Sequence, residues 1–216
     1  MSHSIPCRGL LFDSDGVLVD SDASVLLSWS RWAERWSLDP AQVTATVHGR
    51  RSADTVALLI DGADRARALA EIDRYEVEDA TAVTACPGAA ELLGGLPGDR
   101  WAVVTSGRRN LATARLAAAG LPLPAVLVPA EDVPRGKPDP AGYLRAAAAL
   151  GIAPEECVVL EDSPAGIAAG LAAGAAVLGV SARALGTPAA VVVRDLRGLA
   201  WREGALYVPD AALLRR

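Results

Sequence analysis

The sequence has few cysteines and few aromatic residues, and both shortages limit what the protein can be. Its three cysteines, Cys7, Cys86 and Cys157, are an odd number and include no CxxC pair. This spacing argues against a disulfide framework or a zinc knuckle and favours a reducing compartment. Aromatic residues make up only 4% of the chain, so alanine, valine and leucine must build most of the core.

The chain also lacks an excess of basic residues and any long apolar segment. Its formal net charge is -5, whereas a nucleic-acid-binding domain normally presents a basic face. No stretch reaches the ~20 uninterrupted apolar residues of a membrane-spanning helix, and the N-terminal residues MSHSIPCRG contain no apolar signal core. We therefore expect a cytoplasmic protein that binds neither nucleic acid nor membranes. With 51% hydrophobic residues, it has enough apolar material for a large domain with an insertion.

Short, continuous apolar runs recur along the chain and end at polar or glycine-rich residues. Continuous rather than alternating hydrophobicity is typical of strands that are buried on both faces of a parallel sheet. Helical patterns separate most of these runs and end at Gly120, Gly151 and Gly174, where a helix C-terminus favours glycine. We predict an α/β fold with a doubly wound, mainly parallel, Rossmann-like sheet. The predicted strands are residues 9–12, 101–104, 125–128, 157–160, 175–180 and 190–193, and the helices are 110–119, 142–150 and 164–173.

One interval breaks this alternation, because residues 22–85 contain no buried strand. Tryptophans 29, 32 and 36 recur at helical spacing, and Asp39-Pro40 is typical of a helix start. Further helices are predicted over residues 52–60 and 63–81. We therefore expect residues 18–85 to form an inserted α-helical cap domain, and residues 1–17 with 86–216 to form the catalytic core.

Polar side chains follow four of the predicted strands, at the edge where open α/β sheets bind ligands. The first strand is followed by Asp13 and Asp15, and the second by Thr105, Ser106 and Gly107. Lys137 follows the third strand within RGKPDP, and Glu161 and Asp162 follow the fourth. We expect all of these groups to converge on one rim of the sheet.

This set of residues predicts phosphoryl chemistry. Carboxylates without thiolates or a histidine cluster suit a hard cation, and we expect Mg²⁺. A threonine hydroxyl and the amides of a tight turn form a cradle for phosphate oxygens, to which Lys137 adds a positive charge. One carboxylate can attack phosphorus to form an aspartyl-phosphate, and a second can transfer a proton to the leaving oxygen.

Four stretches carry a family resemblance: FDSDGVLVDS, VVTSG, RGKPDP and VLEDSPAGIAAG. Each alone is a weak signal, since a turn, a helix cap or a surface lysine would explain it. In this order they resemble the motifs of the haloacid dehalogenase-like phosphohydrolases, and with their flanks they span nearly the whole chain. The helical insertion corresponds to the cap between that family's first two motifs. The stretch HGRRSADT resembles the cap of sugar-phosphate and glycerol-phosphate phosphatases.

The resemblance implies a role for each matching residue. Asp13 is then the nucleophile and a magnesium ligand. Asp15 is the general acid/base, with its carbonyl on the metal. The phosphoryl group binds Thr105, the amides of Ser106 and Gly107, and Lys137, which also neutralises the nucleophile. Asp162 is a metal ligand, and Glu161 is a second or water-mediated one.

The resemblance also places the cap segment around His48 and Arg51 against the substrate, with Arg51 as the contact residue. Asp20 and Ser21 are interpreted as a hinge residue and a helix cap, and Ser163 as the cap of the helix that follows it. We expect the two domains to be joined near residues 16–22 and 82–88 and to close over the substrate.

These observations favour a Mg²⁺-dependent phosphatase of a small phosphorylated sugar or polyol, acting as a monomer or weak homodimer. A phosphosugar mutase would use the same core and pass the phosphoryl group to another sugar hydroxyl. A receiver-type signalling domain is much shorter, lacks a cap and carries its accepting aspartate on a later strand. A dehalogenase would have no use for Asp15.

Overall fold

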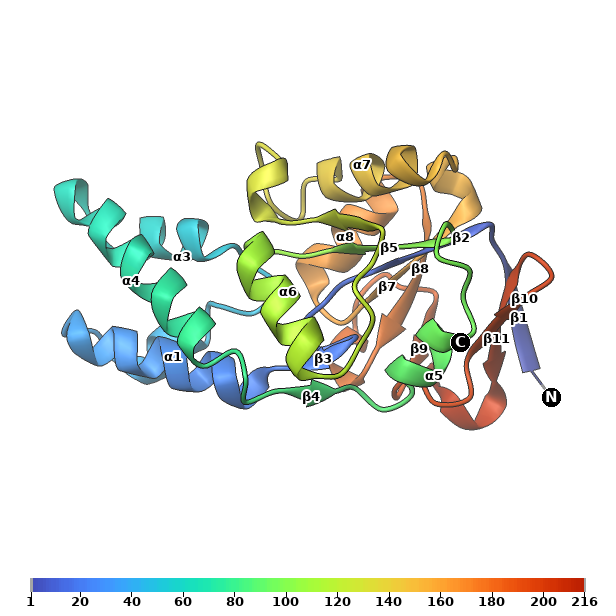
Figure 1. Ribbon diagram of the computed structural model, residues 1–216, viewed down its shortest axis with the longest axis horizontal. Helices are drawn as coiled ribbons and strands as arrows, with labels where there is room; N and C mark the ends of the chain where they lie inside the picture. The colour runs from blue at the N-terminus through green and yellow to red at the C-terminus, as the bar shows by residue number, and fades with distance from the viewer. Residues whose placement is uncertain (1, 216) are drawn as a thin grey trace.

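The apolar runs of the sequence form the central sheet in the computed structural model, which describes residues 2–215 (Figure 1). Its seven strands lie in the order β12-β9-β8-β7-β2-β5-β6. The six predicted strands pair with one another only in parallel, and β12 at one edge pairs antiparallel with β9, so the mainly parallel sheet is confirmed. The strands are β2 Gly9–Phe12, β5 Trp101–Val104, β6 Val126–Val128, β7 Cys157–Glu161, β8 Ala176–Val180, β9 Val191–Val193 and β12 Leu213–Arg215.

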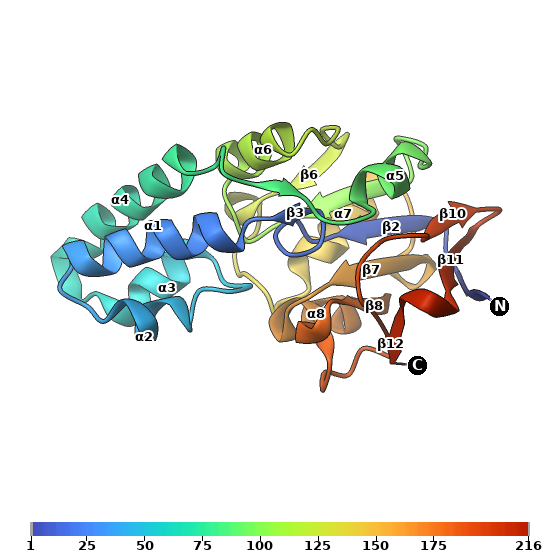
Figure 2. The same cartoon turned by 90° about the horizontal axis from the view of Figure 1, so that it is seen from below.

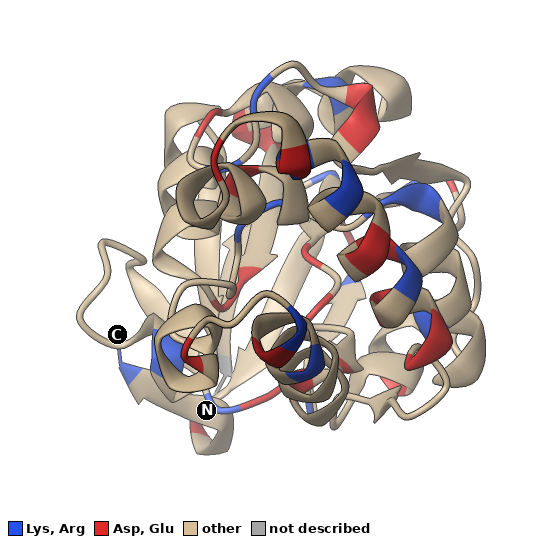
Figure 3. Ribbon diagram, turned by 90° about the vertical axis from the view of Figure 1, so that its left-hand side faces the viewer, with Lys and Arg blue, Asp and Glu red and all other residues tan. Residues whose placement is uncertain are grey.

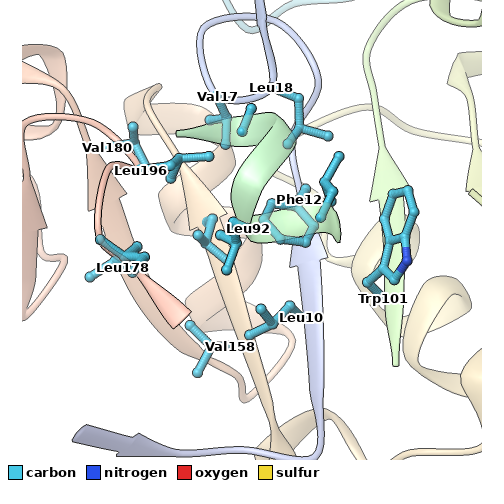
Figure 4. Close-up of a cluster of buried hydrophobic side chains, with 14 of the residues drawn as sticks. Leu10, Phe12, Val17, Leu18, Leu92, Trp101, Val158, Leu178, Val180 and Leu196 are labelled. Atoms are coloured by element: carbon cyan, nitrogen blue, oxygen red, sulfur yellow. The ribbon is translucent and has the colours of Figure 1, made fainter. Parts of the chain in front are cut away.

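Helices cover both faces of this sheet, as a doubly wound fold requires. Leu10 and Phe12 of β2 lie in one apolar cluster, with side chains from α5 and α6, whereas Leu11 lies in the other, with side chains from α7 and α8. All three of these side chains are fully buried. Figure 4 shows the first cluster, in which Phe12 and Trp101 meet edge to face. The helices are α5 Ala89–Gly94, α6 Arg109–Ala118, α7 Ala141–Leu150 and α8 Pro164–Ala172.

The strand order contains a topological switch point between β2 and β7. From β2 the sheet continues to β5 and β6 on one side, and β7, β8 and β9 extend the other side. Connections therefore leave the carboxyl ends of β2 and β7 in opposite directions and open a crevice between them. The residues that follow these two strands are those predicted to carry the chemistry.

Four helices form the other end of the molecule (Figures 1 and 2). They are α1 Asp22–Arg35, α2 Pro40–Thr44, α3 Ser52–Leu59 and α4 Arg65–Glu78. The chain enters this part through β3, Val19–Asp20, and leaves through β4, Thr84–Ala85, and the two pair antiparallel. Both segments fall inside the predicted junctions at 16–22 and 82–88, and the boundaries at 17/18 and 85/86 stay a prediction.

The helical part has an apolar core of its own. Trp29 and Trp32 are buried in it, and the Trp32 indole donates a hydrogen bond to the carbonyl of Ala68 at 2.9 Å, which ties α1 to α4. Asp39 caps α2 by accepting a hydrogen bond from the amide of Ala41, as the Asp-Pro pair predicts. Figure 3 shows acidic and basic residues interspersed along the helices at this end.

A second, three-stranded sheet was not predicted. It pairs β1 Ser2–Pro6 with β11 Ala205–Pro209, which also pairs with β10 Ala200–Arg202, all antiparallel. β11 buries only alternate residues, and β1 is short and polar, so neither gives the continuous apolar signal of the main strands. Among residues 2–215, no helix is long and apolar enough to cross a membrane.

Candidate active site

Asp13 and Lys137 form a buried ion pair at the switch point. Asp13 directly follows β2, and its Oδ1 lies 2.6 Å from the Lys137 Nζ. The same ammonium group lies 2.6 Å from Oε1 of Glu161, the last residue of β7. Burial lowers the pKa of Lys137, but the two carboxylates outweigh it and raise the pKa above its usual value. The lysine is therefore held as a fixed positive charge beside the candidate nucleophile.

Glu161 is completely buried and accepts four hydrogen bonds. Its Oε1 accepts from Lys137 and from the hydroxyl of Tyr143, at 2.6 and 2.9 Å. Its Oε2 accepts from the amide and the hydroxyl of Ser163, at 3.1 and 3.0 Å. A direct bond from Glu161 to a metal ion would therefore compete with one of these donors. The geometry supports an anchor for Lys137 more directly than the predicted metal-ligand role.

Three carboxylates converge closely enough to hold a metal ion. Asp13, Glu161 and Asp162 each present an oxygen atom, and these atoms all lie within 4.8 Å of one another. Gly16 permits this approach, because a Cβ at this position would lie only 2.3 Å from Oδ2 of Asp162. Its φ of +83° also favours glycine as the chain leaves the sheet.

The donor set and its electrostatics fit a hard divalent cation. The three side chains offer only carboxylate oxygens. Burial, together with the negative charges of Glu161 and Asp162, raises the pKa of Asp13 well above its usual range. Burial and Glu161 likewise raise the pKa of Asp162 to about 6, although Arg183 opposes the shift. A bound cation would offset this repulsion and keep the carboxylates ionised.

The loop after β5 lies beside this cluster and makes the predicted tight turn. Thr105 is buried, and its Oγ1 accepts a hydrogen bond from the Gly107 amide at 3.0 Å. The Gly107 amide is thus engaged within the loop, so a phosphate oxygen would have to share it with Thr105. Ser106 donates from its hydroxyl to the carbonyl of Gly49 at 3.1 Å, which links this loop to the cap.

A cavity lies between the cap and the core. It is lined from the core by Asp13, Asp15, Ser106, Arg115, Asp162 and Arg183, and from the cap by Trp29, His48, Arg50, Ser52 and Glu76. The predicted position of His48 against the substrate site is consistent with this lining, whereas its role stays a prediction.

Arg51 pairs with Asp54 at 2.8 Å and donates to the carbonyls of Val133 and Pro134, so it joins the cap to a core loop. It lies outside this cavity but lines a second one with Thr105 and Lys137, and its contact with the substrate stays a prediction. The structure corrects one sequence-based expectation. Ser21 precedes α1 but makes no capping hydrogen bond, because its hydroxyl donates to Oδ1 of Asp15 at 2.6 Å.

Several charged residues of the cavity were missed by the sequence analysis, among them Arg115, Glu76 and Arg183. Arg115 of α6 is buried and pairs with Asp15 at 2.9 Å. Glu76 of α4 is also buried, and Arg183 pairs with Asp162 and with Asp22. A signal for the first two was present: Arg115 lies four residues after buried Leu111, and Glu76 four residues after buried Ile72. A charge on the apolar stripe of a helix indicates a specific partner or ligand.

Comparison with known proteins places this geometry in a family. The model of the haloacid dehalogenase-like hydrolases matches residues 7–174. Hexitol phosphatase A of Escherichia coli (strain K12) is 49% identical over 183 residues, which cover 82% of this chain and 85% of that protein. Glycerol-1-phosphate phosphohydrolase 2 of Saccharomyces cerevisiae is 32% identical over 190 residues, covering 82% and 76%. The crystal structure of beta-phosphoglucomutase from Clostridium difficile matches with a TM-score of 0.78 at 20% identity, over 88% of this chain and 92% of that chain, which is a likeness of fold.

The chain belongs to the haloacid dehalogenase-like hydrolase family. Within this family it is a phosphatase, that is, a phosphoric monoester hydrolase. Both the family predicted from the four motifs and the enzyme class are confirmed.

Proposed function

We propose that this protein is a Mg²⁺-dependent phosphatase of a small phosphorylated sugar or polyol and acts through a phosphorylated Asp13. The observation that carries the proposal is the buried cluster of Asp13, Lys137 and Asp162 at the switch point of the sheet. The names of two relatives, hexitol phosphatase A and glycerol-1-phosphate phosphohydrolase 2, support the substrate class.

In this mechanism Asp13 attacks the phosphorus atom of the ester. Lys137 holds Oδ1 of Asp13, which leaves the second carboxylate oxygen to act as the nucleophile. The Thr105 hydroxyl and the turn that follows it hold the phosphoryl oxygens. Asp15 gives a proton to the leaving oxygen as the ester bond breaks, and later takes a proton from the water that attacks the phosphorylated Asp13.

The metal ion would be held by Asp13 and Asp162, with the backbone carbonyl of Asp15. When bound, it neutralises charge that develops on the transferring phosphoryl group. Lys137 and Arg183 balance the remaining negative charge of the cluster, through Asp13 and Asp162 respectively. The cap excludes bulk water by resting on the phosphate-binding loop through the hydrogen bond from Ser106 to Gly49.

The test is release of inorganic phosphate from sorbitol 6-phosphate and glycerol 1-phosphate, with Mg²⁺ and with EDTA. We expect Asp13→Asn to lower kcat by more than about 1,000-fold, as loss of a nucleophile does in other enzymes. Asp99→Asn is a matched control, because Asp99 is exposed and far from the cluster in the chain. Unchanged turnover in Asp13→Asn would remove Asp13 as the nucleophile. Interconversion of sugar phosphate isomers without phosphate release would identify a mutase instead.

A further inference from the structure

Arg115 lines the cavity and carries two buried donors that lack a hydrogen-bond acceptor in the described part of the chain. Its side chain is only 3% exposed, and its Nη1 donates to Oδ1 of Asp15 at 2.9 Å. The Nε and Nη2 atoms are buried and have no hydrogen-bond acceptor among residues 2–215. Buried donors of this kind are rare, because each forfeits the hydrogen bonds it would make in water. An unpaired, buried guanidinium face at a cavity therefore indicates a missing oxygen-bearing partner.

A carboxylate from the cap lies just beyond reach of these donors. Oε1 of Glu76 is 3.8 Å from Nη2 of Arg115, whereas a charge-assisted hydrogen bond spans ~2.7–2.9 Å. The other oxygen of Glu76 accepts a hydrogen bond from the Ser52 hydroxyl at 2.8 Å, which fixes the carboxylate from the far side. If the pair served only to tie the cap to the core, the two groups would be expected to close to direct contact.

The donors of Arg115 and the acceptor of Glu76 determine which chemical group can bind beside them. Arg115 offers donors and Glu76 offers an acceptor, and because Nη2 and Oε1 are 3.8 Å apart, a ligand atom would contact both from beside the pair and not from between them. A hydroxyl group can accept from the first and donate to the second. A second carboxylate would be repelled by Glu76, a protonated amine would be repelled by Arg115, and an apolar group would leave both unpaired. Arg115, Glu76 and Ser52 line the same cavity as Asp13 and Asp15.

We propose that Arg115 and Glu76, with Ser52, form a specificity subsite that binds a hydroxyl group of the substrate near its ester oxygen. The inference rests on the proposed phosphatase function and names the feature that its substrate must carry. Arg115 also contacts Asp15, the residue that protonates the leaving oxygen, so the hydroxyl it binds belongs to a carbon close to that oxygen. Because Glu76 and Ser52 come from the cap and Arg115 from the core, such a hydroxyl also helps to close the cavity.

Two phosphate esters of equal chain length test the subsite. Glycerol 1-phosphate and n-propyl phosphate differ only in two hydroxyl groups. We expect the wild-type protein to favour glycerol 1-phosphate in kcat/KM, because a site built for hydroxyls rejects an analogue that lacks them. Glu76→Met keeps the side-chain length but removes the acceptor. It should reduce the preference roughly 10- to 100-fold, the effect of losing a hydrogen bond to a charged group.

Further variants separate recognition from folding. Glu76→Gln retains a carbonyl oxygen and should restore part of the preference. Ser52→Ala removes only the hydroxyl that orients Glu76, should fold, and should lower the preference by a smaller factor. Glu78→Met is the matched control on the same helix, since Glu78 is half-exposed and pairs with Arg31 and Arg74. It should leave the preference as in the wild type.

The outcomes discriminate between the two proposals. If the wild-type protein hydrolyses both esters with equal kcat/KM, or if Glu76→Met and Ser52→Ala slow both esters equally, the subsite is refuted while the phosphatase stands. If the wild-type protein releases phosphate from no ester in the presence of Mg²⁺, the proposed function fails and the subsite with it.

Discussion

Replacing Tyr143 with phenylalanine separates two roles for Glu161, as an anchor for Lys137 or as a metal ligand. Tyr143 is 1% exposed, and its hydroxyl donates to Oε1 of Glu161, the same oxygen that accepts from Lys137. Phenylalanine keeps the ring, whose centroid lies 5.4 Å from the Lys137 Nζ. The substitution therefore removes one of the four donors to Glu161 and leaves the packing in place.

The expected cost follows from the surroundings of Glu161. A hydrogen bond to a charged group contributes ~1.5–3 kcal/mol. Three donors remain on Glu161, so we expect the lower limit, about 1.5 kcal/mol in the free energy of unfolding. For a chain of this size that corresponds to a fall in Tm of ~3–6 °C. We expect kcat to fall about tenfold, because Glu161 holds Lys137 less firmly against Asp13.

Magnesium titration decides between the two roles. If Glu161 acts through Lys137, the Mg²⁺ concentration at half-maximal activity should stay within about twofold of the wild type. If Glu161 coordinates the metal directly, release of Oε1 from Tyr143 should strengthen Mg²⁺ binding. Tyr207→Phe, in β11 and away from the cluster, is the control for a lost tyrosine hydroxyl. Wild-type Tm and kcat, or tighter Mg²⁺ binding, would refute the anchoring role.

Two further outcomes are expected. Arg51→Ala should raise KM about 2- to 5-fold for glycerol 1-phosphate and n-propyl phosphate alike, because Arg51 ties the cap to a core loop; a loss confined to the polyol ester would contradict this. The increase in Tm that Mg²⁺ produces should be large at pH 7.5 and small at pH 5. Burial raises the pKa of Asp162 to about 6, so below that pH a proton competes with the cation. Equal stabilisation by Mg²⁺ at both pH values would exclude this competition.

The sequence predicts the centre of the site well because strand ends are easy to locate. A continuous apolar run such as residues 9–12 marks a buried parallel strand, and the residue after it must lie at the rim of the sheet. Asp13 follows such a run directly, Glu161 and Asp162 together follow another, and the structure places the three carboxylates in one cluster. Ser163 caps α8 as predicted, because the Ser-Pro pair is a strong local signal for a helix start.

The periphery of the site is harder to predict because it depends on which helix face meets which neighbour. Arg115 and Glu76 come from different parts of the chain and meet only when the cap rests on the core. Arg51 pairs with the nearby acid Asp54 and donates to a core loop, and the sequence did not indicate either contact. Serine is a common helix-capping residue, but the Ser21 hydroxyl donates to the carboxylate of Asp15 and so does not cap α1. In each case a tertiary partner overrides the local pattern.

The narrow ribbon of β3 and β4 has a consequence for how the molecule can change over evolutionary time. Val19 pairs with Ala85 and Asp20 with Thr84, so the two ends of the helical excursion are neighbours. The two connecting segments therefore leave the core side by side, as the two strands of a hairpin do. The entropic cost of closing the loop between them rises only slowly with the number of residues inserted. A cap of another size could replace this one without moving β2 or the residues that follow it. The part of the substrate preference that the cap carries and the catalytic chemistry are thus encoded in separable stretches of the chain, and one can diverge while the other is retained.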